Sequence, residues 1–395
     1  MKKKLLFVID SLTIGGAEKS LVSLLNMIDS SKYEIDLLLF KKGGDFEKYV
    51  PKYINILPVP EYFRFVNKET FSVTKNVLYF YHRIKTSLNL RINNYRINNI
   101  LHSEQVVFAS INKVLSPIEK DYDVAIAYSQ GMPTYFVSKK VKSSKKIAWI
   151  NNDYISTIFN KELDYESYKN IDTIVTVSDY TKNSVSQMRC EYSEKVDLIL
   201  DIVNPDMICK MAEEYEIHEY DKSLVNILTV GRLDVTKGYD RAIRVAKLLR
   251  ESGYNFKWFA IGEGPERKKL QELINMYELN DYFILLGKKL NPYVYMKGCD
   301  IYVQTSVKEG FGLTVSEAKI LKRPIVCTSF PTAKEIINNT VDGLIVDHDI
   351  CSIYNGIKKY IDDNSFRNKI TNELNSIEPY STVSQLNKFY ELTKK

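Results

Sequence analysis

The chain has 395 residues, too many for one ordinary hydrophobic core, so about two domains are expected. A hydrophobic content of 45% and a charged content of 26% are typical of a soluble globular protein. Five scattered cysteines without a CxxC pair and four dispersed histidines exclude a disulfide framework and a structural zinc site, and they favour a reducing compartment.

The first predicted element is a buried strand over residues 5–9. This apolar run is too short for a signal peptide or a membrane span, so we expect a cytoplasmic protein. A loop with Gly15 and Gly16 follows, then apolar residues at helical spacing over 17–28 and a second strand over 33–40. This order predicts a parallel, Rossmann-like sheet, although the loop lacks the GxGxxG pattern.

A basic and aromatic insert occupies about residues 62–116. Aromatic residues alternate there with lysine and arginine, and acids are few (Glu69 and Glu104). Such helix-prone segments favour the surface of an anionic membrane. The alternative is a set of helices packed on the domain with a solvated basic face. No nucleic-acid recognition motif accompanies the basic residues, so no nucleic-acid partner is expected.

Strands and helices then alternate again up to a charged stretch without strands, residues 205–223, which we interpret as the connection between two domains. The strands expected before it lie at 123–128, 146–150, 173–177 and 195–199, with helices at 133–137 and 179–188.

The second half repeats the strand–glycine turn–helix theme. Gly231 and Gly262 each follow a predicted strand, and Pro265 is placed to begin a helix. Further elements are expected as strands at 224–230, 256–261, 282–286, 301–304, 325–328 and 343–346 and as helices at 239–251 and 380–395.

The predicted fold class is therefore α/β, with two Rossmann-like domains whose parallel sheets face a central cleft. We expect an N-terminal domain over 1–204, a C-terminal domain over 205–379, and a terminal helix over 380–395 that returns to the first domain.

The segment from Glu309 to Glu317 predicts an anion site. It links a strand to a helix through Gly310 and Gly312, and the first backbone N–H groups of such a helix are unpaired and can bind a phosphate. The two carboxylates that bracket the turn suit the hydroxyls of a sugar nucleotide. A plain helix start with surface acids is the alternative.

Two cations lie in the loop after the strand at 224–230. The guanidinium of Arg232 and the ammonium of Lys237 together match a diphosphate. If the amides of Leu313 and Thr314 face them, fixed groups would stabilise a departing diphosphate. Taken singly, either residue would be interpreted as an ordinary surface cation.

In order and spacing, these motifs resemble the retaining family 4 (group 1) glycosyltransferases of the GT-B fold, among them bacterial surface-polysaccharide enzymes. The resemblance rests on Gly231-Arg232-Leu233 with Lys237-Gly238, Gly262-Glu263-Gly264-Pro265, Glu309-x7-Glu317 and Gly15-Gly16-Ala17-Glu18.

The resemblance implies roles for these residues. Arg232 and Lys237 would bind the donor diphosphate, Glu317 would hold the ribose, and Glu309 would meet the hydroxyls of the transferred sugar. The remaining donor contacts implied are backbone around Gly15, Gly16, Gly231, Gly262, Gly310, Phe311, Gly312, Leu313 and Thr314.

One position departs from the family pattern. Asn151 stands where the family often has a histidine, and an amide can hydrogen-bond a sugar hydroxyl but cannot carry a proton. Asp153 is a candidate partner for the acceptor hydroxyl, with a structural turn role as the alternative. No metal is expected, because Arg232, Lys237 and the helix amides would supply the positive charge. The DxD-like Asp121-Tyr122-Asp123 lies at the start of a predicted strand, whereas ligands of this fold gather at the carboxyl ends of strands.

The sequence thus predicts a glycosyltransferase that needs no cofactor and works at the inner face of the plasma membrane. It would move a hexosyl unit from a nucleotide sugar, for which we expect a UDP-sugar, to a glycan or lipid-linked acceptor in surface polysaccharide synthesis. The alternatives are a non-catalytic GT-B partner or glycan-binding subunit, and a nucleotide-sugar epimerase.

Overall fold

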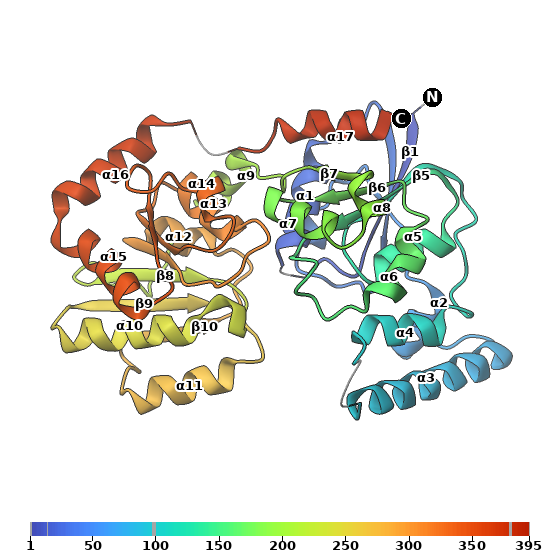
Figure 1. Ribbon diagram of the computed structural model, residues 1–395, viewed down its shortest axis with the longest axis horizontal. Helices are drawn as coiled ribbons and strands as arrows, with labels where there is room; N and C mark the ends of the chain where they lie inside the picture. The colour runs from blue at the N-terminus through green and yellow to red at the C-terminus, as the bar shows by residue number, and fades with distance from the viewer. Residues whose placement is uncertain (1, 14, 97–99, 379–380, 395) are drawn as a thin grey trace. The chain divides into compact units, whose positions relative to one another are not determined.

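The structure is a computed structural model, and the residues it describes are 2–13, 15–96, 100–378 and 381–394. The chain divides into two compact units (Figure 1). Unit 1 comprises Met1–Ile202 and Ser384–Lys395, and unit 2 comprises Val203–Val383.

Unit 1 is built on a parallel sheet. In its described residues seven strands pair in the order β3-β2-β1-β4-β5-β6-β7. The predicted strand at 5–9 belongs to an interior strand of this sheet, and its residues are buried on both faces, as is usual in a parallel sheet. The strands are β1 (Lys3–Ile9), β2 (Tyr33–Leu39), β3 (Asn55–Ile56), β4 (Tyr122–Ala127), β5 (Ser143–Ile150), β6 (Thr173–Thr176) and β7 (Val196–Leu198).

Helices connect these strands, and the basic insert forms three of them, α2, α3 and α4. Three aromatic residues of the insert, Tyr62, Tyr79 and Phe108, are buried in the core of unit 1, and Phe63, Phe65 and Phe71 pack against it. The helices are α1 (Gly16–Met27), α2 (Glu61–Val66), α3 (Val73–Asn94), α4 (Ser103–Ile111), α5 (Met132–Lys140), α6 (Lys161–Tyr168), α7 (Asp179–Ser186), α8 (Cys190–Ser193) and α17 (Gln385–Lys394), with a 3₁₀ turn η1 (Glu47–Tyr49).

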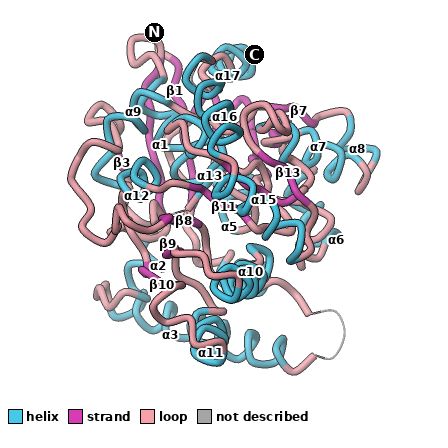
Figure 2. Tube along the Cα trace, turned by 90° about the vertical axis from the view of Figure 1, so that its left-hand side faces the viewer, coloured by secondary structure: helices cyan, strands magenta, loops and turns pink. Residues whose placement is uncertain are grey.

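The last helix, α17, completes unit 1. It lies beside β1 in both views (Figures 1 and 2). Phe389 is fully buried and stacks on Phe7, with ring centroids 6.1 Å apart. The hydroxyls of Tyr33 and Thr393 lie 2.9 Å apart, and Lys3 Nζ donates to the carbonyl of Lys394 at 2.7 Å. Strands β1 and β2 are therefore packed against residues from the far end of the chain.

Unit 2 repeats the architecture with six parallel strands in its described residues, ordered β10-β9-β8-β11-β12-β13. The strands are β8 (Val225–Val230), β9 (Phe256–Ile261), β10 (Phe283–Gly287), β11 (Ile301–Gln304), β12 (Ile325–Thr328) and β13 (Leu344–Val346). Two α/β units with parallel sheets confirm the predicted fold class.

One helix of unit 2, α11, begins later than expected. Pro265 lies in a turn, and the helix begins two residues later at Arg267. The helices are α9 (Pro205–Met211), α10 (Tyr239–Glu251), α11 (Arg267–Met276), α12 (Tyr293–Gly298), α13 (Leu313–Ile320), α14 (Ala333–Ile336), α15 (Ile350–Asp362) and α16 (Asn364–Ser376), with a 3₁₀ turn η2 (Val235–Lys237).

The stretch 205–223 does not form a linker along its length. Residues 205–211 form α9, which begins unit 2, with Ile208 and Met211 buried. Asn291 Nδ2 donates to the carbonyl of Met211 at 2.7 Å and fixes the end of the helix. The charged composition concealed two apolar residues spaced for one buried helix face.

We predict that Phe389→Ala destabilises unit 1 by about 3 kcal/mol, because it removes a fully buried ring and leaves a cavity. Chemical denaturation in a Trp258→Phe background measures this change, since Trp149 of unit 1 is then the remaining tryptophan. Glu391→Ala on the exposed face of α17 is the control. Equal stability of the two variants would contradict a structural role for α17.

Candidate functional site

The predicted donor residues of unit 2 lie where its strand order reverses. The adjacent strands β8 and β11 have neighbours that continue in opposite directions along the sheet, and ligands of such sheets bind beyond the carboxyl ends of the strands at this point. The loop with Arg232 and Lys237 follows β8, and the loop with Glu309 follows β11. The topology therefore brings the two predicted motifs together.

An ion pair joins the two loops. Lys237 Nζ donates to both carboxylate oxygens of Glu309, at 2.7 and 2.6 Å. The side chains are only 20% and 10% exposed, so each charge is shielded from water and depends on the other. The N–H of Val307 also donates to the carbonyl of Thr236 at 2.7 Å, which fixes the spacing of the loops.

Buried polar groups orient the Glu309 carboxylate. Ser306 Oγ donates to Glu309 Oε1 at 2.7 Å, and Gln304 Nε2 donates to the same oxygen at 3.2 Å. Tyr302 and Thr314 donate in turn to Gln304 Oε1, at 2.7 and 3.4 Å. Oε1 thus accepts three hydrogen bonds, whereas Oε2 accepts one from the described residues and keeps capacity for a ligand hydroxyl. Ser306, Gln304 and Tyr302 were not predicted as site residues. The position of Ser306, three residues before Glu309, could have indicated that its hydroxyl contacts the carboxylate.

Two glycines are required by backbone geometry at these loops. Gly238 has φ +65°, and a Cβ there would lie 2.3 Å from the carbonyl oxygen of Thr305. Gly312 has φ +96° and is the N-cap of α13. Other residues rarely adopt this left-handed conformation, so glycine allows both the loop contact and the helix start.

The start of α13 offers unpaired amides. No group in the described part of the chain accepts a hydrogen bond from the backbone N–H of Leu313 or Thr314, while those of Val315 and Ser316 bond to the carbonyl of Gly312. Free amides at a helix N-terminus attract anions. The hydroxyl of Thr314 bonds to Gln304, which in turn donates to Glu309, so the start of α13 is tied to the ion-pair site.

Arg232 is exposed and has no ion-pair partner among the described residues. It therefore differs from Lys237, whose ammonium is already engaged. Glu317 is 1% exposed and accepts a hydrogen bond from the hydroxyl of Tyr293 at 3.1 Å. Its predicted contact with a ribose stays a prediction.

Three predicted donor contacts also have structural reasons. A Cβ at Gly262 would lie 1.8 Å from the carbonyl oxygen of Gly231, so close packing of the β8 and β9 ends accounts for this glycine. The Gly231 carbonyl accepts from the hydroxyl of Tyr239 at 2.9 Å. The Phe311 ring is buried, and its carbonyl accepts from Thr332 at 3.0 Å. Gly310 lies in the bend between Glu309 and Phe311.

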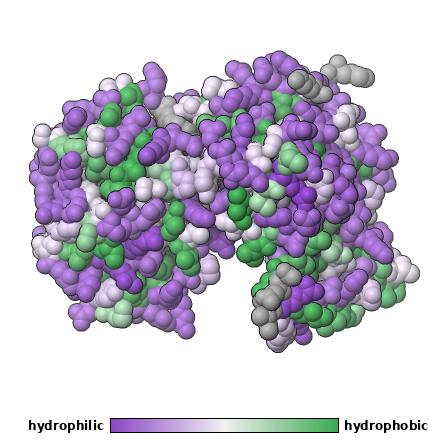
Figure 3. Space-filling model, viewed as in Figure 1, coloured by the Kyte–Doolittle hydropathy of each residue, from purple (hydrophilic) through white to green (hydrophobic). Residues whose placement is uncertain are grey.

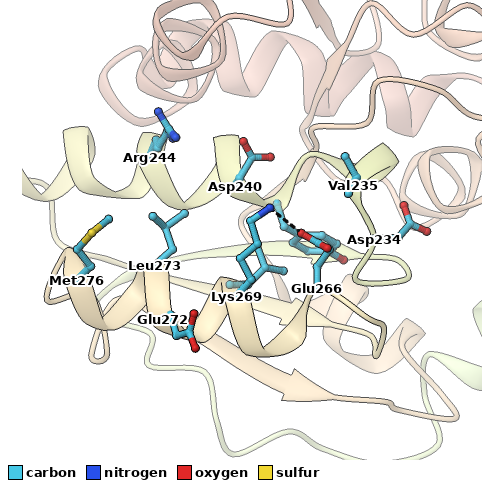
Figure 4. Close-up of a pocket in the computed structure, with 11 residues that line it drawn as sticks. Asp234, Val235, Asp240, Arg244, Glu266, Lys269, Glu272, Leu273 and Met276 are labelled. Atoms are coloured by element: carbon cyan, nitrogen blue, oxygen red, sulfur yellow. Dashed lines mark hydrogen bonds and ion pairs between the residues drawn. The ribbon is translucent and has the colours of Figure 1, made fainter. Parts of the chain in front are cut away.

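A cavity of about 370 Å³ lies between α10 and α11 (Figure 4). Acids and bases of both helices line it, among them Asp240, Arg244 and Lys269, and Lys269 pairs with Glu266 at 3.1 Å. Neither Lys237 nor the other predicted site residues line it. The cavity is thus separate from the ion-pair site.

Unit 1 presents carboxyl groups at its own reversal point, between β1 and β4. Asp10 directly follows β1 and accepts a hydrogen bond from Ser129 Oγ at 3.3 Å. Burial raises the pKa of Asp10 to about 8, the negative charges of Glu104 and Glu18 add to the rise, and the bond from Ser129 opposes it. Burial also raises the pKa of Glu104. Asp10 was missed as a site residue, although it directly follows the first strand.

Asn151 and the glycine loop lie at the same edge of unit 1. Asn151 follows β5 and its Nδ2 donates to the carbonyl of Tyr128 at 2.9 Å, whereas its buried Oδ1 accepts no hydrogen bond from the described residues. Such an oxygen needs a partner, and a ligand hydroxyl would supply one. Gly15 is the N-cap of α1 and Gly16 its first residue; the loop before them includes residue 14, which lies outside the described residues.

The contacts of Asp153 fit a structural role, which was the alternative to a role in binding the acceptor. Ser184 Oγ donates to Asp153 Oδ1 at 2.6 Å, and the hydroxyl of Tyr180 donates to Oδ2 at 3.1 Å. Both donors come from α7, so the carboxylate ties the loop after β5 to that helix. A direct role toward an acceptor stays a prediction.

The DxD-like pair lies at the amino end of β4. Asp123 Oδ2 accepts from the N–H of Lys4 at 2.7 Å and so supports the sheet, while Asp121 precedes the strand. Within the described residues, no group of three histidine, cysteine or acidic side chains could hold a metal ion.

The chain is similar to known proteins in sequence and in fold. Residues 210–375 match the family described as Glycosyl transferases group 1. The chain is 29% identical over 239 residues to the N-acetylgalactosamine-N,N'-diacetylbacillosaminyl-diphospho-undecaprenol 4-alpha-N-acetylgalactosaminyltransferase of Campylobacter jejuni, covering 58% of this chain and 62% of the relative. It is 29% identical over 203 residues to the poly(ribitol-phosphate) alpha-N-acetylglucosaminyltransferase of Staphylococcus aureus, covering 49% and 41%.

The matches therefore span about half of the curated relatives' length.

Among solved structures, the S. aureus TarM structure superimposes over 100% of both chains with a TM-score of 0.68 and 17% identity. That likeness confirms the GT-B fold.

We predict that Asp10→Asn removes part of the pH dependence of stability. Between about pH 4 and pH 8 the folded protein holds a proton on Asp10 that the unfolded chain, with a pKa of 3.8, releases, so the free energy of unfolding falls as pH rises through this window. Thermal denaturation at pH 5 and pH 8 should show a smaller loss of Tm in Asp10→Asn than in the wild type. The exposed Asp121→Asn should keep the wild-type loss, and an identical loss in all three proteins would disprove the assignment.

Proposed function

We propose that this protein is a retaining glycosyltransferase with a UDP-sugar as donor, and the match of residues 210–375 to the glycosyl transferases group 1 family supports this proposal. The observation that carries the proposal is the Lys237–Glu309 ion pair at the reversal point of the unit 2 sheet, next to the free amides of α13. A hexosyl unit is transferred to a glycan or lipid-linked acceptor in surface polysaccharide synthesis. The uridine is supported by the TarM structure, which contains UDP.

The donor diphosphate binds through the cations and amides of unit 2. Arg232 is exposed and unengaged in the described part of the chain, so its guanidinium can form two parallel bonds to phosphate oxygens. The N–H groups of Leu313 and Thr314 supply neutral donors, and Lys237 adds a charge held in place by Glu309. These fixed groups stabilise the negative charge that develops as the diphosphate leaves.

The reaction exchanges one bond to the anomeric carbon for another on the same face of the sugar. The bond from that carbon to the diphosphate oxygen breaks, the acceptor oxygen forms the new bond, and the acceptor proton passes to the leaving phosphate. Glu309 Oε2 accepts a hydrogen bond from a hydroxyl of the sugar and fixes its orientation, since Oε1 is occupied by three donors. Glu317 holds the ribose. No metal ion is required, because the cations and amides neutralise the diphosphate.

The acceptor binds to unit 1. Asn151 Oδ1 accepts from an acceptor hydroxyl, and a protonated Asp10 can donate to another, since its pKa is raised to about 8. Support for a lipid-linked acceptor comes from the name of the C. jejuni relative, which includes diphospho-undecaprenol. Such an acceptor would place the reaction at the cytoplasmic face of the plasma membrane.

The proposed reaction predicts transfer from a UDP-sugar when the protein is incubated with UDP- and GDP-sugars and a lipid-linked acceptor, with or without EDTA. Glu309→Gln should lower kcat at least about a hundredfold, because an oriented carboxylate at the sugar is lost. Chromatography of the products measures it. Conversion of donor without acceptor would indicate an epimerase, and nucleotide binding without turnover would indicate a non-catalytic subunit; either result rejects the proposal.

Arg232→Ala should weaken UDP binding by about 2 kcal/mol, roughly thirtyfold in Kd, because a charged hydrogen bond to the diphosphate is removed. Isothermal titration calorimetry with UDP and with uridine measures the change, and uridine binding should be unaffected. Lys268→Ala, an exposed cation on α11, is the control. Equal UDP affinity of Arg232→Ala and the wild type would show that Arg232 does not contact the diphosphate.

A further inference from the structure

Helix α3 carries an apolar stripe on its solvent-facing side. We define this outer stripe as Val77, Phe80, Tyr81, Ile84, Leu88 and Ile92, whose exposed fractions lie between 47% and 66%. Their spacing of three or four residues places them along one side of the helix. Figure 3 shows apolar residues, in green, among polar ones over the region where Figure 1 draws α3.

The opposite face of α3 packs on unit 1 and is more polar than the outer stripe. His82 and Asn93 are buried, and His82 Nδ1 lies 2.7 Å from the carbonyl oxygen of Ser110 on α4. Asn89 Nδ2 donates to Ser110 Oγ at 2.9 Å. A surface helix ordinarily buries its apolar face, so α3 is oriented in the reverse sense. These polar contacts and the ring of Tyr79, which is buried in the core of unit 1, hold the helix in place and leave the outer stripe exposed.

Positive charges border the outer stripe. Arg83 and Lys85 flank Ile84 in sequence and, at about 100° per residue, lie on opposite sides of it. Arg91 lies next to Ile92 toward the end of the helix. These three cations have no ion-pair partner among the described residues, and residues 70–103 contain no aspartate or glutamate. The surface therefore combines apolar side chains with a positive field that no local acid offsets.

We propose that the outer stripe of α3 is the surface by which this protein binds an anionic lipid bilayer. Apolar side chains enter the boundary between headgroups and acyl chains, and the flanking cations bind the anionic headgroups. A second copy of the chain fits this surface less well, because pairing two stripes would bring the same unpaired cations together. No helix among the described residues is long and apolar enough to span a bilayer, so α3 lies on the surface. The inference rests on the proposed function in that a lipid-linked acceptor would lie in the same bilayer.

Only some aromatic and basic residues of the insert have side chains that are free to contact a membrane. Tyr62, Tyr79 and Phe108 are buried in the core and cannot reach a membrane. Lys75 is paired with Glu61 at 2.6 Å. The binding surface is thus confined to one side of one helix.

Flotation of the full chain with vesicles tests the proposal. The wild type should bind vesicles of phosphatidylcholine with phosphatidylglycerol, and bind vesicles of phosphatidylcholine alone at least about tenfold more weakly. The variant Phe80→Ser/Ile84→Ser/Ile92→Ser should lose about tenfold or more in partition coefficient. Ile158→Ser/Met276→Ser, which replaces residues exposed to 68% and 64% elsewhere, should bind as the wild type does.

A variant without the flanking cations measures the electrostatic contribution to vesicle binding. Arg83→Gln/Lys85→Gln/Arg91→Gln should lose roughly fivefold in partition coefficient per charge. Its matched control, Lys52→Gln/Lys222→Gln/Lys268→Gln, removes the same net charge from exposed sites elsewhere and should change binding by less than about twofold.

Three outcomes would overturn the proposal: no binding of the wild type to anionic vesicles, equal binding of both α3 variants and their controls, or a concentration-dependent dimer in light scattering that the serine variant disrupts. The assay contains no donor sugar and so is independent of catalysis. A protein that binds vesicles but turns over no donor would refute only the proposed transfer, and one that transfers sugar to a soluble acceptor but ignores vesicles would refute only this surface.

Discussion

The ion pair between Lys237 and Glu309 is the interaction on which the site of unit 2 depends. It joins the loop after β8 to the loop after β11, 72 positions apart in sequence. Because both charges are largely removed from water, neither loop can move away without leaving the other charge poorly solvated. Hydrogen bonds from Ser306 and Gln304 reinforce the carboxylate and extend the constraint into the sheet. The two loops of the proposed diphosphate site are therefore already held together in the folded unit before any ligand binds.

The two units contribute different chemistry to the proposed reaction. Unit 2 contributes permanent charge through Arg232 and Lys237, which suits a phosphate ligand. Unit 1 contributes groups that are neutral near neutral pH, the amide of Asn151 and the carboxyl of Asp10, whose pKa burial raises to about 8. Neutral donors and acceptors suit sugar hydroxyls. The amide in place of a histidine is consistent with this division, since proton transfer is assigned to the leaving phosphate.

The elements predicted most accurately were those whose pattern is local. The buried run of β1 and the helical spacing of α1 each depend on side chains within a few residues, and both were found. The meeting of Lys237 with Glu309 followed from topology, because loops after neighbouring parallel strands share one edge. Periodicity and turn residues therefore carried the fold class, while the roles of the site residues stay predictions.

What the sequence could not predict depends on long-range packing. The raised pKa of Asp10 comes from its surroundings in the folded unit, including Glu104, which is 94 positions away in sequence. Composition could not divide the insert into a buried and an exposed aromatic set, because Tyr79 and Phe80 are adjacent yet one is 3% and the other 58% exposed. The connection at 205–223 was misread for the same reason: Ile208 and Met211 find apolar neighbours only in the folded unit.

The return of α17 to unit 1 affects the order of events during synthesis. The ribosome makes β1 and β2 early, but their partners Phe389, Tyr390 and Thr393 leave the exit tunnel only after all of unit 2 has been made. Unit 2 is continuous in sequence and can fold while unit 1 still lacks its last helix. The N-terminal unit is thus the later of the two to reach its final packing. Until α17 is made, the apolar surface around Phe7 and Tyr33 lacks its cover, and this is the surface that a chaperone would shield.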